Sequence, residues 1–235
     1  MKLHHETRPV IAAVGLDFEA RAVRGPGVAV IYGQSRSKYL QELHSKARLG
    51  ARGVISFGIA GGISPRLRPG DIVVAEAVVT ASGIFHTSRE WSRALRQALP
   101  KAHYMPIFGA EAPVLTVLEK EALWSATGAG TVDMESSAAA EVAAHHKLPF
   151  AALRVVLDPA HRPIPLSAIA GARADGKTDG TAVLRSLMRR PQDFRGVLRL
   201  ANDTRIATQA LFRCRQSLGP FLGLLDAMKL PLNVE

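Results

Sequence analysis

One stretch of the chain, residues 128–146, constrains the fold more than any other. It starts as a short apolar strand, ends in the carboxylates Asp133 and Glu135, and continues as an alanine-rich segment without Gly or Pro, which predicts a helix. In a sheet covered by helices, such corners at the carboxyl ends of strands line the crevice where ligands bind. We expect Asp133 to complement the positive end of the helix, because acids are common in a first helical turn. Glu135 is the stronger functional candidate of the two.

Continuous apolar runs elsewhere in the chain predict further strands that are buried in a sheet. Helical periodicity or capping-box patterns predict helices that begin near residues 37, 87 and 116. This alternation predicts one α/β domain over residues 1–235, with helices on both faces of the sheet. Residues 159–178 are expected to form a loop or lid, and residues 179–235 to be helical, with helices at 182–190, 194–201 and 205–217. The apolar runs are residues 9–15, 28–33, 53–58, 71–79, 104–109 and 149–158.

The chain is basic, and its charge is unevenly distributed. It carries 30 Lys and Arg against 20 Asp and Glu, and residues 161–235 hold twelve basic and six acidic residues. Such a surface favours polyanions or anionic membranes, but no zinc spacing or RNA-binding aromatic motif accompanies it, so we expect no nucleic-acid partner. The single cysteine, Cys214, excludes an internal disulfide and suits a reducing compartment. The lack of a signal peptide or a long apolar run predicts a cytoplasmic protein, with peripheral contact at the inner membrane face left open.

Three acids, Glu19, Glu135 and Asp158, follow buried strands or the turns after them. If these strands are parallel neighbours, their carboxyl ends meet near the glycine-rich loop of residues 58–62, whose N–H groups suit an anion or sugar hydroxyls. Several carboxylates beside such a loop fit a reaction that develops positive charge in the substrate and protonates a leaving group. Cleavage of a glycosidic bond is such a reaction. Acids at strand ends also cap helices, so this pattern alone leaves both roles open.

Three sequence blocks carry a family resemblance: FGIAGGISPRLRPGDIVV at residues 57–74, VDMESSAAA at 132–140 and LRVVLD at 153–158. In order and spacing they resemble the signature motifs of the nucleoside phosphorylase and methylthioadenosine nucleosidase superfamily, over residues 9 to about 160. The resemblance implies a three-layer α/β/α fold with a mixed central sheet, followed by C-terminal helices, and a homo-oligomer. Motifs from residue 158 to residue 220 further resemble the branch of hopanoid-associated phosphorylases.

The resemblance implies a role for each matched residue. Asp158 matches the acid that protonates N7 of the departing purine, and Glu135 matches the acid that hydrogen-bonds the ribose hydroxyls. Glu19 falls close to the acid that activates water in nucleosidases, in a region where some phosphorylases bind phosphate. Leu157 departs from the Ser or Thr that usually precedes the final acid. The other matched positions are Met134, Asp133, Ala60, Gly61 and Gly62 for the substrate, and Gly15 and Arg21 for phosphate.

The implied reaction is cleavage of the N-glycosidic bond of an adenosine with a hydrophobic 5' substituent, such as adenosylhopane, with release of adenine. Phosphate is the favoured acceptor and co-substrate, and water is the alternative. The expected partner is therefore a small purine nucleoside, lipid-linked in the hopanoid branch. No metal and no organic cofactor is implied.

Two interpretations of another class compete with this one. Residues 171–178 fit the phosphate-loop pattern G-x-x-x-x-G-K-[ST], but prolines interrupt the segment before them and residues 179–180 delay the next helix, so we interpret the match as a coincidence. The chain could also be a basic membrane-surface binding protein, because arginines of the last helices precede the apolar residues 221–225. Packing of these apolar residues on the sheet or on a partner subunit is the competing expectation.

The paired histidines are the remaining candidates for metal binding. Neither His4 and His5 nor His145 and His146 have partners at metal-ligand spacing in the sequence, and adjacent residues on a helix do not share a face. The sequence therefore predicts surface or core roles for them and no metal site.

Overall fold

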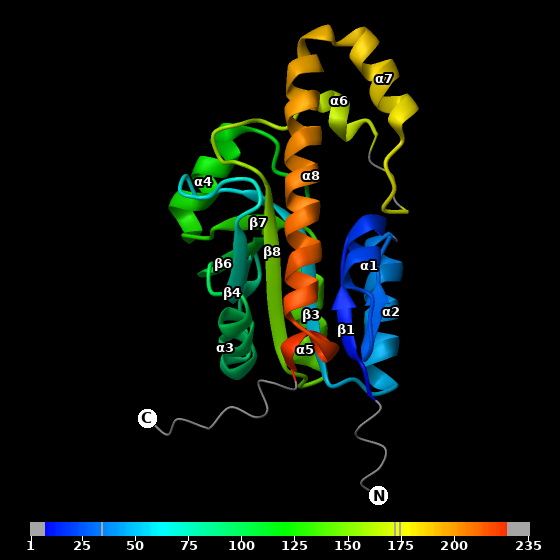
Figure 1. The fold of residues 1–235 in the computed structure, drawn as a ribbon, viewed down its shortest axis with the longest axis vertical. Coiled ribbons are helices and arrows are strands. Elements are labelled where there is room, and N and C mark those ends of the chain that lie inside the picture. The colour runs from blue at the N-terminus through cyan, green and yellow to red at the C-terminus, as the bar shows by residue number, and fades with distance from the viewer. Residues whose placement is uncertain (1–7, 34, 172, 174, 225–235) are drawn as a thin grey trace, which may run out of the picture.

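The computed structural model describes residues 8–33, 35–171, 173 and 175–224. A mixed sheet of eight strands lies between two layers of helices (Figure 1). This architecture, with further helices after the last strand, confirms the predicted three-layer α/β/α fold. The strands are β1 (Val10–Ala13), β2 (Val28–Ile31), β3 (Gly53–Gly62), β4 (Ile72–Thr80), β5 (Gly83–His86), β6 (His103–Gly109), β7 (Thr131–Asp133) and β8 (Phe150–Asp158).

The helices connect and cover these strands. They are α1 (Asp17–Val23), α2 (Arg36–Arg48), α3 (Arg89–Ala98), α4 (Val117–Thr127), α5 (Ser136–His145), α6 (Leu166–Ile169), α7 (Gly180–Arg189) and α8 (Phe194–Ser217). Figure 1 shows α6, α7 and the first half of α8 extending beyond one end of the sheet.

The strand pairing brings distant segments of the chain together. β1 pairs in parallel with β2 and β3, and β3 pairs in parallel with β8. β8 also pairs antiparallel with β4, so the strands β3, β8, β4, β6 and β7 close a ring. In the register of β3 and β8, Gly61 lies beside Asp158. The glycine-rich loop and the last predicted acid therefore meet at one end of the sheet.

Alternation along the strands creates a core on each side of the sheet, because successive strand side chains point to opposite faces. Val10 and Ala12 of β1 face a core that α1, α3 and α8 cover. Ile11 and Ala13 face the other core, which α2 and α5 cover. The alanine-rich sequence of α5 lets this helix pack closely on the sheet, and seven of its ten residues are buried.

Local signals located most helix starts, with two differences. Thr116 and Glu119 form the predicted capping box of α4. At α3 the cap is Ser88, whose hydroxyl accepts from Trp91 N, because the Thr87 hydroxyl instead donates to Ala75 O. Helix α1 was not predicted; it joins β1 to β2, which pair in parallel.

The C-terminal segment is more continuous than the sequence predicted. Residues 194–217 form one helix, α8, where two were expected, because its small residues lie on a face that packs against the sheet. Leu218, Leu222 and Leu224 are buried, and Trp91 Nε1 donates to Leu222 O at 2.9 Å. These leucines therefore pack on the core, while Leu225 lies outside the described residues.

Two further predictions concern sequence patterns. The phosphate-loop-like segment follows the short helix α6 and not a strand, so it lacks the strand context that such a loop needs. In the described part of the chain, no helix is both long and apolar enough to span a membrane.

Candidate active site

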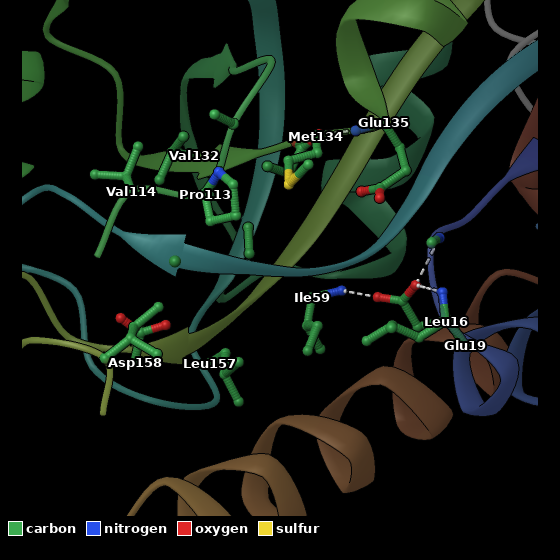
Figure 2. Close-up of a pocket in the computed structure, with 16 residues that line it drawn as sticks. Leu16, Glu19, Ile59, Pro113, Val114, Val132, Met134, Glu135, Leu157 and Asp158 are labelled. Carbon is green, nitrogen blue, oxygen red and sulfur yellow. Dashed lines mark hydrogen bonds between the residues drawn. The ribbon is translucent and has the colours of Figure 1, made fainter. Parts of the chain in front are cut away.

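A cleft of about 210 Å³ opens beside the ends of β3, β7 and β8 (Figure 2). Asp158 lies at one end of this cleft, and Glu19 and Glu135 lie at the other. The structure thus brings together the three acids that the sequence singled out. The cleft is lined by Gly15, Leu16, Glu19, Ile59, Ala60, Gly61, Ala112, Pro113, Val114, Val132, Asp133, Met134, Glu135, Leu157, Asp158 and Ile164.

The carboxylate of Glu19 is fixed by backbone N–H groups. Its Oε2 accepts from Gly15 N and Leu16 N, both at 2.8 Å, and its Oε1 accepts from Ile59 N at 2.6 Å. Gly58 must be glycine for this approach, because a Cβ there would lie 2.3 Å from Glu19 Oε1. Burial raises the pKa of Glu19, although Arg154 and the three N–H donors oppose the rise. A buried, oriented carboxylate of this kind is suited to accept a proton.

Glu135 and Asp133 have different surroundings at the corner between β7 and α5. Asp133 Oδ1 accepts from the backbone N–H groups of Glu135 and Ser136, at 2.9 and 2.7 Å, so Asp133 complements the positive end of the helix, as expected. Glu135 points into the cleft with about a quarter of its side chain exposed. A Cβ on Gly15 would lie 2.4 Å from Glu135 Oε1, so a larger residue there would displace the Glu135 carboxylate. The geometry leaves Glu135, more than Asp133, available to a ligand.

Arg154 is the buried positive charge behind these acids. Its Nε donates to Asp133 Oδ2 at 2.9 Å, and its Nη2 lies 3.7 Å from Glu135 Oε2. Burial is the largest of the causes that raise the pKa of Glu135, to about 7; Arg154 opposes the rise, and the charges of Asp133 and Glu19 add to it. One arginine thus neutralises only part of the acidic cluster, and Glu135 titrates near neutral pH.

Asp158 pairs with Lys120 of α4, and both side chains are buried. Lys120 Nζ donates to Asp158 Oδ2 and also to the carbonyl oxygens of Pro159 and Arg162, at 3.1 and 2.8 Å. The other carboxylate oxygen, Oδ1, is buried and has no hydrogen-bond partner among the described residues. Burial raises the pKa of Asp158, although Lys120 opposes the rise. Asp158, which lines the cleft, therefore keeps one carboxylate oxygen that can exchange a proton with a bound molecule.

The remaining predicted residues divide into two groups. Ala60, Gly61 and Met134 line the cleft, whereas Gly62 does not, and a Cβ on Gly62 would lie 2.9 Å from Asp158 O. Arg21 also lies outside the lining; its side chain is exposed and pairs with Asp17. The N–H of Gly15 is used by Glu19. The structure therefore does not place the two predicted phosphate-binding residues where they could hold an anion in this cleft.

Sequence reasoning missed Lys120 and Arg154. The sequence did contain a sign of Arg154, because a charged residue within an apolar strand must find a buried partner. Nothing in the sequence indicated that Lys120 is buried, because a lysine in the second turn of a helix is ordinarily exposed.

A second cavity, of about 350 Å³, adjoins the cleft and shares Glu135, Met134 and Pro113 with it. Arg36 and Tyr39 of α2 line its far side, together with Arg173 from the segment before α7. A substrate with a substituent can extend from the cleft into this space.

The paired histidines are placed differently from the prediction. His44 of α2 lies against His145 and His146 at the end of α5. Sequence spacing could not show this contact, because His44 and His146 are 102 residues apart. The structure thus adds a neighbour that spacing along the chain did not indicate, while the expected absence of a metal site stays a prediction; His4 and His5 lie outside the described residues.

This mixed sheet between helix layers, with a cleft at the strand ends, is the fold of nucleoside phosphorylases and nucleosidases. Residues 3–189 match the profile of the phosphorylase superfamily, so the chain belongs to that family. Comparison with curated protein sequences gave no match.

Solved structures show the same fold at low sequence identity. The 5'-methylthioadenosine/S-adenosylhomocysteine nucleosidase of Helicobacter pylori is 14% identical, with a TM-score of 0.62 over 94% of this chain and 98% of that one. Futalosine hydrolase of the same species is 18% identical, with a TM-score of 0.57 over 64% of this chain and 88% of that one. The 5'-methylthioadenosine/S-adenosylhomocysteine nucleosidase of Campylobacter jejuni is 13% identical, with a TM-score of 0.59 over 89% of this chain and 99% of that one.

Proposed function

We propose that this protein cleaves the N-glycosidic bond of a purine nucleoside and releases the free base. The observation that carries the proposal is the buried, unpartnered Oδ1 of Asp158 at one end of a cleft whose other end holds Glu19 and Glu135. A raised pKa suits Asp158 to donate a proton, while two further carboxylates suit a substrate that becomes cationic.

In the proposed reaction, the bond between C1' of the ribose and N9 of the purine breaks and its electron pair goes to the base. Asp158 donates its proton to N7, so the base leaves neutral. Glu135 accepts hydrogen bonds from ribose hydroxyls, and its negative charge stabilises the cationic sugar. An acceptor oxygen then bonds to C1'.

We propose water as that acceptor, with phosphate as the alternative. Besides the protonated Asp158, three acidic side chains line the cleft, and none of the described residues that line it is lysine or arginine. A phosphate dianion would be repelled there, because like charges at short range disfavour each other. In this proposal Glu19, which lines the cleft, takes the proton from water and leaves hydroxide to attack C1'.

An exposed apolar and basic surface on α7 and α8 supports a hydrophobic 5' substituent. The segment before α7 borders the second cavity, which Arg173 and Gly176 help to line, and Asp17 N donates to Gly176 O at 3.1 Å. A lipid-linked nucleoside held at an anionic membrane would fit this surface, because apolar side chains enter the interface while arginines bind lipid phosphates. The surface comprises Leu184, Met188, Phe194 and Leu198, with Arg185, Arg189, Arg190, Arg195 and Arg199.

The test is adenine release from adenosine, methylthioadenosine and an adenosine with a lipid 5' substituent in anionic or neutral liposomes, each with and without phosphate. We expect release without phosphate, fastest from the lipid-linked substrate in anionic liposomes. Glu19→Gln should lower this rate by about 10²–10⁴-fold, the usual worth of a general base. Release that depends on phosphate would reassign the acceptor, and no release from any substrate would overturn the function.

The pH dependence of kcat/KM should report the ionisation of the Glu135 carboxylate. This carboxylate must be ionised to accept from the ribose, so kcat/KM should fall about tenfold per pH unit below its pKa of about 7. This fall is the acidic limb of the pH profile, and rates of adenine release between about pH 5 and 9 measure it. Glu135→Gln should remove the limb with its midpoint near 7, and persistence of that limb in the variant would contradict the assignment.

A further inference from the structure

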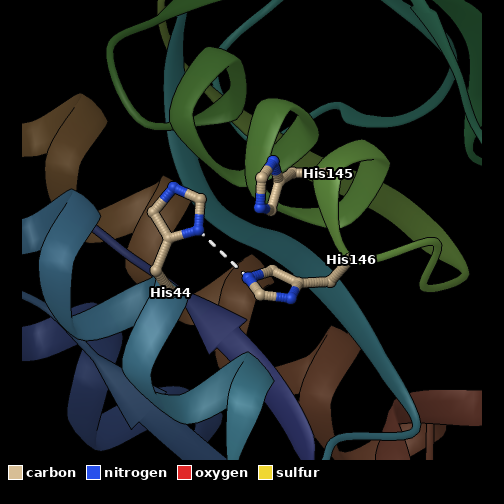
Figure 3. Close-up of side chains that lie close together, drawn as sticks. All are labelled: His44, His145 and His146. Carbon is tan, nitrogen blue, oxygen red and sulfur yellow. Dashed lines mark hydrogen bonds between the residues drawn. The ribbon is translucent and has the colours of Figure 1, made fainter.

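Three histidines meet at the end of the α2–α5 helix pair, away from the cleft (Figure 3). One potential ligand nitrogen from each of His44, His145 and His146 lies within 4.8 Å of the others. His44 Nδ1 and His146 Nε2 are 3.0 Å apart, and the ring centroids are separated by 4.8 to 5.2 Å. Tetrahedral Zn²⁺ with Zn–N bonds of about 2.0–2.1 Å needs nitrogens about 3.3 Å apart. The His44–His146 pair is already close to that separation, and binding requires the third imidazole, within 4.8 Å, to turn toward the same ion.

The cluster is exposed at His145 and borders a surface cavity at His44. His145 is exposed, and His44 and His146 are partly buried. A surface cavity of about 370 Å³ beside His44 is lined also by Gln41, Ser45 and Arg48. The cationic Arg48 weakens the binding of a metal ion but does not occupy a ligand position.

Two helix ends favour a cation at this place. Arg36 Nη2 lies 3.5 Å from Ser137 Oγ at the starts of α2 and α5, and His44 meets His146 near their ends, so the helices run in the same direction. Both C-termini, which carry partial negative charge, therefore approach the histidine cluster.

We propose that His44, His145 and His146 bind one divalent transition-metal ion of the Zn²⁺ class, with water completing the coordination. Imidazole nitrogens select Zn²⁺, Cu²⁺, Ni²⁺ or Co²⁺ over Mg²⁺ and Ca²⁺, which prefer oxygen ligands. The ion would link the C-terminal ends of α2 and α5. The opposite ends of these two helices hold Tyr39 and Glu135, which line the substrate pockets. Its effect is to stabilise this helix pair, and it takes no part in the glycosidic reaction.

The experiment uses the full chain without an affinity tag, with Zn²⁺ as the titrant in calorimetry and Co²⁺ as the spectroscopic probe. We expect one equivalent of Zn²⁺ per chain and ligand-field absorption typical of nitrogen-ligated, tetrahedral Co²⁺. At Zn²⁺ about 100-fold above Kd, Tm should rise by about 5–10 °C.

Substitutions locate the ion. Each of His44→Ala, His145→Ala and His146→Ala should weaken Zn²⁺ affinity by at least about 100-fold. Mutation of residues that only hydrogen-bond to metal ligands already lowers metal affinity by about 10–100-fold, and loss of a ligand itself should cost more. His145 is exposed, so its replacement should leave the Tm of the metal-free chain unchanged. The controls His86→Ala and the double variant His4→Ala/His5→Ala should bind like the parent chain.

Each outcome decides the proposal. Binding lost in the three cluster variants and kept in both controls supports it. Binding that survives removal of all three cluster histidines, that disappears with His4 and His5, or that is not detected in the parent chain overturns it.

Discussion

Asp158→Asn is expected to lower kcat for base release by about 10²–10⁴-fold, because an amide cannot donate the proton that makes the purine a neutral leaving group. The prediction rests on Asp158, which lines the cleft and whose Oδ1 has no hydrogen-bond partner among the described residues. Single-turnover adenine release measures the chemical step directly. A variant with unchanged kcat would end the assignment of Asp158 as general acid.

The partner of Asp158 supplies the control. Asp158→Asn leaves the buried ammonium of Lys120 without its counter-charge, which by itself lowers stability. The double variant Asp158→Asn/Lys120→Met removes both charges and should recover much of the lost Tm. If turnover also recovered, the loss in the single variant would be structural, whereas continued inactivity in a stable double variant supports proton donation.

Arg154→Met is expected to destabilise the protein by about 3–5 kcal/mol, because it leaves buried carboxylates without their cation. For a chain of this size, the expected fall in Tm is about 6–20 °C. Arg154 is fully buried, donates to Asp133, and lies close to Glu135 and Glu19. Thermal unfolding at several pH values measures the effect.

The pH dependence separates this electrostatic loss from simple loss of packing. Removing Arg154 raises the folded-state pKa values of the neighbouring acids further, so the variant folds with bound protons. Its deficit relative to the parent should be largest above neutral pH and smaller near pH 5, where the acids can take up those protons. The control Arg93→Met, at an exposed arginine of α3, should change stability by less than about 0.5 kcal/mol. A deficit for Arg154→Met that is independent of pH would contradict the electrostatic explanation.

The fold was predictable from the sequence because its signals are local. Apolar runs marked the buried strands, and the Thr116–Glu119 capping box marked the start of α4. Helix α1 escaped because its seven residues are too few to show a clear period. The two predicted pieces of α8 are one helix because packing on the sheet outweighs the local weakness of residues 202–204.

The acids of the candidate site were also predictable, as were their positions at the ends of strands or in the segments that follow them. Glu19, Glu135 and Asp158 follow apolar segments whose burial the sequence itself indicates, and glycines that permit close approach lie beside them. Their roles as proton donor, ribose ligand and base stay predictions that the variants above test.

By itself, the sequence determined the strand-forming runs, the glycine-rich loop and the acids that line the cleft, because each depends on neighbours close along the chain. Only the tertiary structure decided that Lys120 pairs with Asp158, that Arg154 lies behind three carboxylates, and that His44 meets His145 and His146. Burial among these partners also sets the pKa of Glu135 near 7. Such effects depend on charges and side chains that are distant in sequence, and local periodicity carries no information about which of them will meet.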